Sequence, residues 1–228
     1  MSLKQFLNEV NGKERVEGEL IKAILYSLLV SFGLFAILYY FSLRHIEDFI
    51  PKYGFFIFLV ILSYAVILPS IRQVRAYQNF ACMSGMMIGM TTGMIAGFLP
   101  GFFIGSTNGM FWGSVFGMGI GIFIGVWNGK CCGIMGVMEG LMAGFMGGIM
   151  GAMTAVMMIN DNLRIAGVVV FVISSLIVFA LNYMIYKETK ELPRERTEDY
   201  TLIVFLSLIF TALTLFFMIY GPRSVLFA

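Results

Sequence analysis

Methionine is concentrated in the middle of the chain, where its thioether sulfurs could bind a soft metal ion. Fifteen of the 18 methionines lie between Met83 and Met158. Two sets repeat every four residues, which places their sulfurs about 6 Å apart on one helix face. The first set is Met86, Met90 and Met94, and the second is Met138, Met142, Met146 and Met150, flanked by Met135 and Met153. Thioether sulfur prefers Cu(I) to hard ions. The ladders therefore favour copper binding, and the alternative is packing, because this flexible side chain fills irregular gaps beside glycine.

Three cysteines could supply stronger soft ligands. Cys82, Cys131 and Cys132 lack the spacing of a disulfide framework, which predicts reduced thiols. We expect them at one membrane depth, beside Lys130, whose charge would favour the thiolate. Four methionines are expected near the same level: Met83, Met86, Met135 and Met138. The alternatives are small apolar residues with a structural role or, for the vicinal pair, palmitoylation. The single histidine, His45, leaves no zinc-ligand spacing.

Glu139 is the one acid within any predicted membrane span. A carboxylate inside a bilayer is costly and marks a candidate ion or proton site. The structural alternatives are a neutral Glu139 that hydrogen-bonds to a neighbouring helix and an ion pair with Lys130. Four hydroxyl residues in the same region are expected to form hydrogen bonds between helices: Thr91, Thr92, Ser114 and Thr154.

The elements that position these residues are marked by glycine, which recurs at every fourth position from Gly85 to Gly133 and again from Gly136 to Gly148. Glycine is a poor helix former in water, but in lipid small residues at i and i+4 let two helix backbones approach closely. The glycines expected at these contacts are Gly85, Gly89, Gly93, Gly97, Gly113, Gly117, Gly121, Gly125, Gly140, Gly144 and Gly148. They predict a glycine-zipper unit of three helices.

The composition predicts an all-α, polytopic integral membrane protein. Hydrophobic residues make up 59% of the chain, charged residues 12%, and the mean hydropathy is +0.90. These values are outside the range of soluble globular domains. The net charge of +2 without a basic stripe argues against a nucleic-acid partner. The chain has no nucleophile motif, phosphate-binding loop or dinucleotide fingerprint, so we expect no enzyme activity. No signal peptide is apparent at the N-terminus.

Seven spans are predicted, because a spanning helix needs about 20 apolar residues. The glycine-rich stretch is too long for one span, and Leu99-Pro100-Gly101, Ser106–Gly109 and Asn128-Gly129-Lys130 predict its breaks. A short surface segment (1–22) and a tail (221–228) flank one transmembrane domain (23–220). The predicted spans are 23–43, 54–71, 80–99, 110–127, 133–159, 165–186 and 200–220.

The distribution of Lys and Arg predicts the orientation of the chain. With a cytoplasmic N-terminus, seven spans place eleven basic residues on the cytoplasmic side and four on the other. This asymmetry follows the positive-inside rule and puts the C-terminus outside. The four spans without the glycine repeat are rich in Leu, Ile, Val and Phe. We expect them to form a lipid-facing jacket around the glycine helices.

Together these patterns favour a membrane transport or homeostasis protein for a soft metal, most simply copper. The methionine ladders would pass Cu(I) through the glycine helices, and the cysteines would receive or release it on the cytoplasmic side. The alternative is a glycine-zipper channel, or an assembly subunit of a membrane complex, without a metal role. The expected partners are the lipid bilayer and either further copies of the chain or a membrane complex. In the last case, the loop 187–199 is the expected docking surface.

Overall fold

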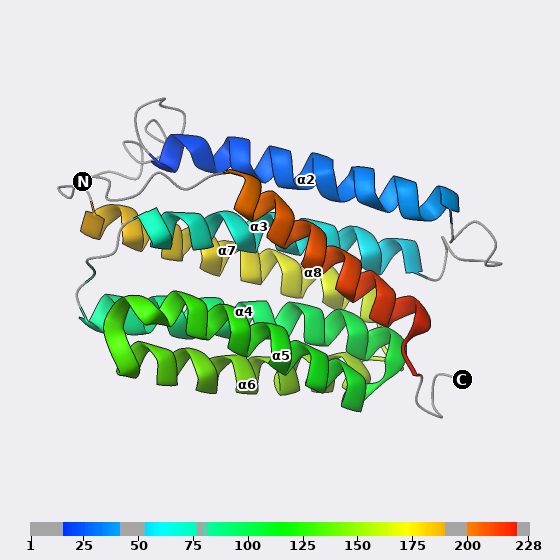
Figure 1. The fold of residues 1–228 in the computed structure, drawn as a ribbon. Coiled ribbons are helices and arrows are strands. Elements are labelled where there is room, and N and C mark those ends of the chain that lie inside the picture. The colour runs from blue at the N-terminus through cyan, green and yellow to red at the C-terminus, as the bar shows by residue number, and fades with distance from the viewer. Residues whose placement is uncertain (1–15, 42–52, 77–79, 81, 190–199, 223–228) are drawn as a thin grey trace.

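The chain folds into helices that run back and forth between two ends of the molecule. The computed structural model describes residues 16–41, 53–76, 80, 82–189 and 200–222, and every regular element among them is helical. The helices are α2 (Val16–Phe41), α3 (Phe55–Ala76), α4 (Cys82–Asn108), α5 (Met110–Gly129), η3 (Lys130–Cys132), α6 (Gly133–Met157), α7 (Leu163–Thr189) and α8 (Tyr200–Tyr220). Successive α-helices are antiparallel, so α2 begins at one end and α8 finishes at the opposite end (Figure 1).

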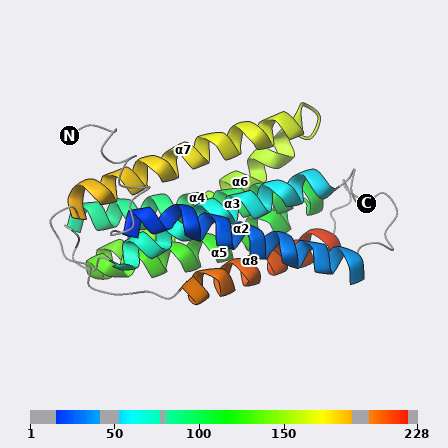
Figure 2. The ribbon, with the colours of Figure 1, turned by 90° about the horizontal axis from the view of Figure 1, so that it is seen from above.

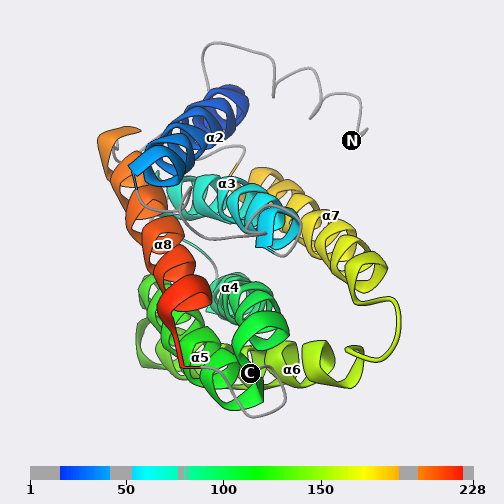
Figure 3. The ribbon, with the colours of Figure 1, turned by 90° about the vertical axis from the view of Figure 1, so that its right-hand side faces the viewer.

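Helices α4, α5 and α6 form the most closely packed part of the fold (Figure 3). Their backbones touch where the repeated glycines lie. A methyl group on Gly121 would lie 2.7 Å from the Cα of Gly97 and 2.9 Å from the Cα of Gly144. One on Gly117 would lie 2.9 Å from the Cα of Gly148. These positions therefore leave no room for a side chain between the three helices.

Two glycines make the sharp turns that bring these helices together. Gly109 has a φ of 105° between α4 and α5, and Gly133 has a φ of 67° where η3 leads into α6. Both angles lie in a region that other residues rarely adopt. The turn at Gly133 directly follows the predicted break at Asn128-Gly129-Lys130.

The first predicted break is right at Ser106–Gly109, where α4 ends and Gly109 makes a turn, and wrong at Leu99-Pro100-Gly101. Helix α4 does not end at Leu99 but continues through Pro100 to Asn108. Beyond the proline, a methyl group on Gly105 would lie 2.9 Å from the Cα of Ala152, so the close packing against α6 continues to this level. Helices in tightly packed bundles tolerate proline when neighbouring groups compensate for the lost hydrogen bond. The helix thus passes the Pro-Gly signal and ends at the next turn signal, Ser106–Gly109.

The remaining helices do not surround the glycine helices as expected. Helices α2, α3, α7 and α8 gather on one side of the three-helix unit (Figures 2 and 3), and α6 packs mainly against α4 and α5. Helix α3 is not lipid-facing either, because Ile57, Tyr64 and Leu68 are about 1% exposed. The predicted jacket is therefore wrong: it covers one side, and the outer surface of α6 stays uncovered.

Four segments are long and apolar enough to cross a membrane: Lys22–Tyr40, Cys82–Asn108, Met110–Met157 and Leu163–Thr189. The third segment contains two antiparallel helices, α5 and α6, joined through η3. Two further apolar helices, Phe55–Ile71 and Val204–Tyr220, are shorter. The chain is thus all-helical, with several long apolar helices compatible with a membrane protein.

Substituting alanine at a glycine contact should destabilise the fold, although alanine favours helix by about 1 kcal/mol. We expect Gly121→Ala to lower the stability by about 1–3 kcal/mol, because the added methyl group meets backbone on two sides. Gly33→Ala is the matched control in α2, where a methyl group meets nothing within 4 Å, and it should stabilise slightly. Thermal unfolding of the purified protein in detergent measures both effects. Equal shifts for the two variants would contradict the packing difference.

Candidate functional site

The predicted methionine ladders lie on the outside of the three-helix unit. Met135, Met138, Met142, Met146 and Met150 of α6 are each at least half exposed. In α4, Met90 and Met94 are 46% and 38% exposed, and Met86 is half-buried. The thioethers therefore do not line the contacts between the glycine helices. A metal ion moving along them would travel over the surface of the unit and not through its centre.

Exposed methionines belong almost entirely to α4 and α6. We call them the methionine face: Met83, Met87, Met90, Met94, Met135, Met138, Met142, Met146, Met150, Met153 and Met157. The large apolar residues exposed on α2, α7 and α8 are Leu, Ile, Val, Phe and Tyr, and none of them is methionine. The exposed surface thus has two compositions, and the methionine-rich one is the part that α2, α3, α7 and α8 leave uncovered.

Two residues of this face, Met87 and Met157, were not singled out from the sequence, and Met83 was expected beside the cysteines but not in a methionine ladder. Met83 and Met87 are 77% and 51% exposed and lie on the same stripe of α4 as Met90 and Met94. Their spacing of four, three and four residues follows the 3.6-residue helical period. A strict repeat of four residues includes Met86 and leaves out Met83 and Met87.

The three cysteines do not form the predicted ligand cluster. The sulfurs of Cys131 and Cys132 are 3.9 Å apart, and both lie against Gly85 of α4. Cys82 is exposed at the first residue of α4, about one turn before Gly85. Among the described residues, no three His, Cys, Asp or Glu side chains are grouped so that they could hold a metal ion. The expected convergence of three thiols is therefore not found, because Gly85 and not Cys82 faces the turn.

The environment of Cys131 opposes a free thiolate. Burial, together with the neighbouring Cys132, raises the pKa of the Cys131 thiol to about 12. Its sulfur donates a hydrogen bond of 3.2 Å to the carbonyl oxygen of Asn128. The prediction that Lys130 would favour the thiolate is therefore wrong for Cys131, because loss of water around the sulfur outweighs a nearby cation that is itself exposed.

Glu139 lies on the methionine face of α6. The spacing from Met135 through Glu139 and Met142 to Met146 is four, three and four residues, which places them on one side of the helix. The Glu139 side chain is half-buried within the protein. The described part of the chain offers its carboxylate no hydrogen bond or ion pair, so neither structural alternative, a hydrogen bond to a neighbouring helix or an ion pair with Lys130, is formed there. The acid thus lies on an apolar surface that other elements of the fold leave uncovered.

The hydroxyl groups of the glycine helices do not bridge helices, contrary to expectation. Each bonds to a carbonyl four residues earlier in its own helix: Thr91 to Met87, Thr92 to Ile88, Ser114 to Met110 and Thr154 to Met150, all at 2.7 Å. A hydroxyl satisfied in this way needs no partner on another helix. Contacts among α4, α5 and α6 at these positions therefore depend on the shape of the backbone.

Two buried amides near the ends of the glycine helices were not singled out from the sequence. Asn108 donates a 2.7 Å hydrogen bond from Nδ2 to the carbonyl oxygen of Phe217, which ties the end of α4 to α8. Asn128 is 1% exposed, and neither polar atom of its side chain has a partner among the described residues. The sequence indicated both only as turn residues, because Asn is common before glycine in turns.

Comparison of the chain with protein-family models, with curated proteins and with solved structures gives no match. The residues and their geometry are therefore the whole basis for assigning a function.

Proposed function

We propose that this is an integral membrane protein of seven spans built around a glycine-packed three-helix core. Seven α-helices in the described part of the chain support this: successive helices are antiparallel (Figure 1), and their basic residues gather at one end of the bundle. Among the described residues, the basic positions at that end are Lys22 near the start of α2, Arg72 and Arg75 near the end of α3, Lys130 at the start of η3 and Lys187 near the end of α7. Arg164, at the start of α7, lies at the opposite end. By the positive-inside rule, the first end is cytoplasmic. The N-terminus is then cytoplasmic and the C-terminus outside.

Its function in this proposal is to bind a transmembrane helix of a partner protein and so act as an assembly subunit of a membrane complex. The observation that carries the proposal is the methionine face. If α6 faced only lipid, the branched and aromatic residues exposed on α7 and α8 would serve equally well. Methionine is flexible and polarizable and suits surfaces that must adapt to another helix.

Glu139 gives the partner a definite chemistry. Ionisable residues within membrane spans almost always face protein or water and pair with another polar group. Glu139 lies about 9 Å along α6 from its first residue, within the apolar helix. A partner helix on this face would therefore carry a hydrogen-bond donor or a cation at the depth of Glu139, surrounded by apolar residues.

The glycine contacts explain why this surface could be presented in a constant shape. A helix whose backbone touches two neighbours along its length has little freedom to bend or rotate. The same contacts argue against the channel alternative. Where a methyl group does not fit between the helices, a hydrated ion could not pass between them.

Soft-metal homeostasis is the second candidate, and the spacing of the exposed thioethers supports it. Met138, Met142, Met146 and Met150 are about one turn apart and open to a ligand. Thioethers select Cu(I). In this version Cu(I) would move along the methionine face, with Cys131 and Cys132 as a two-thiol site at its cytoplasmic end.

Photo-crosslinking tests the assembly function. A photoreactive residue at Met142 should form an adduct of defined mass with a membrane protein in native membranes. The same probe at Val172, exposed on α7, should react with lipid. Glu139→Leu should remove the Met142 adduct, because the partner's donor loses its acceptor, whereas Glu188→Gln should not. Lipid adducts alone at Met142, or an adduct indifferent to Glu139, would contradict the proposal.

Metal analysis tests the second candidate. Purified, reduced protein should retain Cu(I) or Ag(I) in a stoichiometric amount. Met142→Leu with Met146→Leu should weaken binding at least about tenfold, which is ~1.4 kcal/mol, because leucine keeps the volume and removes the sulfur. Val168→Leu with Val172→Leu on α7 is the control. Metal at background level would end the copper hypothesis.

Labelling of single cysteines in a cysteine-free background tests the seven-span topology. An impermeant thiol reagent applied to intact cells should modify Asp161→Cys, in the turn between α6 and α7. It should modify Lys187→Cys, at the end of α7, only after the membrane is opened. Labelling of both positions from the same side would contradict the proposed arrangement of α7.

A further inference from the structure

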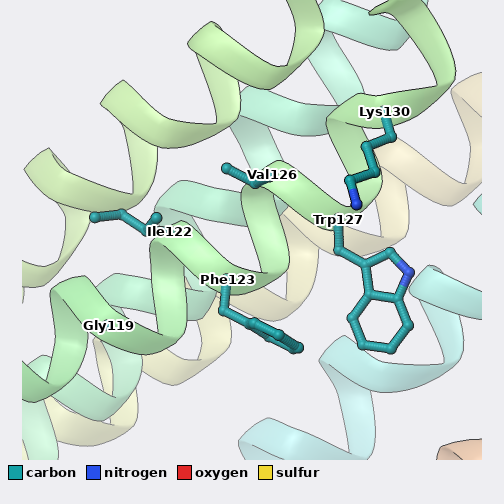
Figure 4. Close-up of a pocket in the computed structure, with 6 residues that line it drawn as sticks. All are labelled: Gly119, Ile122, Phe123, Val126, Trp127 and Lys130. Carbon is teal, nitrogen blue, oxygen red and sulfur yellow. The ribbon is translucent and has the colours of Figure 1, made fainter.

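A groove runs along the outer face of α5 and ends at a lysine. It has a volume of about 580 Å³ and is lined by Gly119, Ile122, Phe123, Val126, Trp127 and Lys130 (Figure 4). Ile122 and Val126 lie along one side, Phe123 and Trp127 along the other, and the Lys130 side chain extends back along the helix toward Trp127. The groove is thus apolar over most of its length and cationic at one end.

The packing of α5 keeps this face open. On one flank, a methyl group on Gly140 of α6 would lie 3.0 Å from the backbone nitrogen of Val126. On the other, the rings of Phe123 and Phe210 of α8 meet edge to face at 6.1 Å. Between them, Gly119 supplies no side chain, and a methyl group there would meet nothing within 4 Å. All the lining residues belong to α5 and to the first residue of η3, so the groove lies on the open face of α5, with α6 on one flank and α8 on the other.

The dimensions of the groove match one leaflet of a bilayer. From Gly119 to Lys130 the helix rises about 16 Å, and the hydrocarbon core of a bilayer is about 30 Å thick. Trp127 lies next to the charged end of the groove. This position fits a membrane interface, because tryptophan is enriched at such interfaces. If the charged end is cytoplasmic, as proposed above, the groove lies within the cytoplasmic leaflet.

The charge at this end lacks a counterion. Lys130 is exposed, and no carboxylate in the described part of the chain forms an ion pair with it. Basic sites on the cytoplasmic side of membrane helices bind anionic lipid head groups. A lysine ammonium beside an apolar groove is complementary to a phosphate ester that carries a hydrocarbon chain.

We propose that this groove binds an anionic phospholipid of the cytoplasmic leaflet, with its phosphate at Lys130 and one acyl chain along the groove toward Gly119. The inference rests on the proposed membrane embedding but not on the partner of α6, since it concerns a different face. The lipid would fill the space between α5 and α8 and anchor the turn that leads into α6.

Native mass spectrometry of the delipidated full-length protein tests this site. Phosphatidylglycerol should bind more tightly than phosphatidylcholine with the same acyl chains. Lys130→Gln should weaken phosphatidylglycerol binding about fivefold, which corresponds to ~1 kcal/mol for one basic residue. Lys187→Gln, which removes an exposed charge at the same end, should leave it unchanged. Equal losses for both variants would show diffuse attraction and overturn the site.

Substitutions that fill the groove with larger side chains provide a second test of the lipid site. Gly119→Leu should weaken both lipids without loss of thermal stability, because the space there is open. Gly33→Leu, also in open space but on α2, is the matched control. Val126→Phe is an independent variant that narrows the same groove. If neither groove variant weakens lipid binding, the acyl chain lies elsewhere and the proposal fails.

Inorganic phosphate distinguishes a lipid from a free anion. Phosphate at millimolar concentration should neither stabilise the protein nor displace phosphatidylglycerol. Displacement that depends on Lys130 would instead assign a phosphate site and overturn the lipid proposal. The loop-labelling experiment tests membrane embedding separately, so a correct topology without selective lipid binding would refute only this inference.

Discussion

Close contact between the backbones of α4, α5 and α6 is the constraint on which the rest of the structure depends. In the proposed membrane setting, helices gain little from burying apolar side chains, so van der Waals contact between well-matched surfaces has to hold them together. Glycine makes that contact possible: at Gly117 and Gly121 even a methyl group would overlap backbone from both neighbouring helices. The turns at Gly109 and Gly133 place the three helices side by side along the chain.

This packing determines where the larger side chains point. With glycine occupying the inner faces, the methionines of α4 and α6 must lie outside, and they give that surface a composition that α7 and α8 do not share. The four remaining helices gather on one side and leave α6 without a cover. A methionine surface that includes a half-buried Glu139 is better suited to another helix than to lipid alone.

The polar residues divide according to what the packing leaves available. Hydroxyls in the glycine helices bond within their own helix, and half-buried Cys131 lies in an environment that disfavours its thiolate. Glu139 and Lys130, in contrast, face outward on different helices. In the proposed functions each of them gives an otherwise apolar surface a chemical preference. Glu139 prefers a hydrogen-bond donor or a cation on a partner helix, and Lys130 prefers the phosphate of a lipid.

The sequence by itself determined the helical class, the long apolar helices and the break before α6, because these follow from hydropathy, glycine spacing and turn residues. It also indicated which residues carry unusual chemistry. Only the tertiary structure decided where they lie: α4 continues through Pro100, Gly85 rather than Cys82 faces the cysteine pair, and the methionines lie outside the unit. The reason is physical. A repeat of four residues identifies one face of a helix. Glycine and methionine follow the same repeat here on two different faces, so the repeat alone does not tell which face is buried. The contacts between the helices determine that.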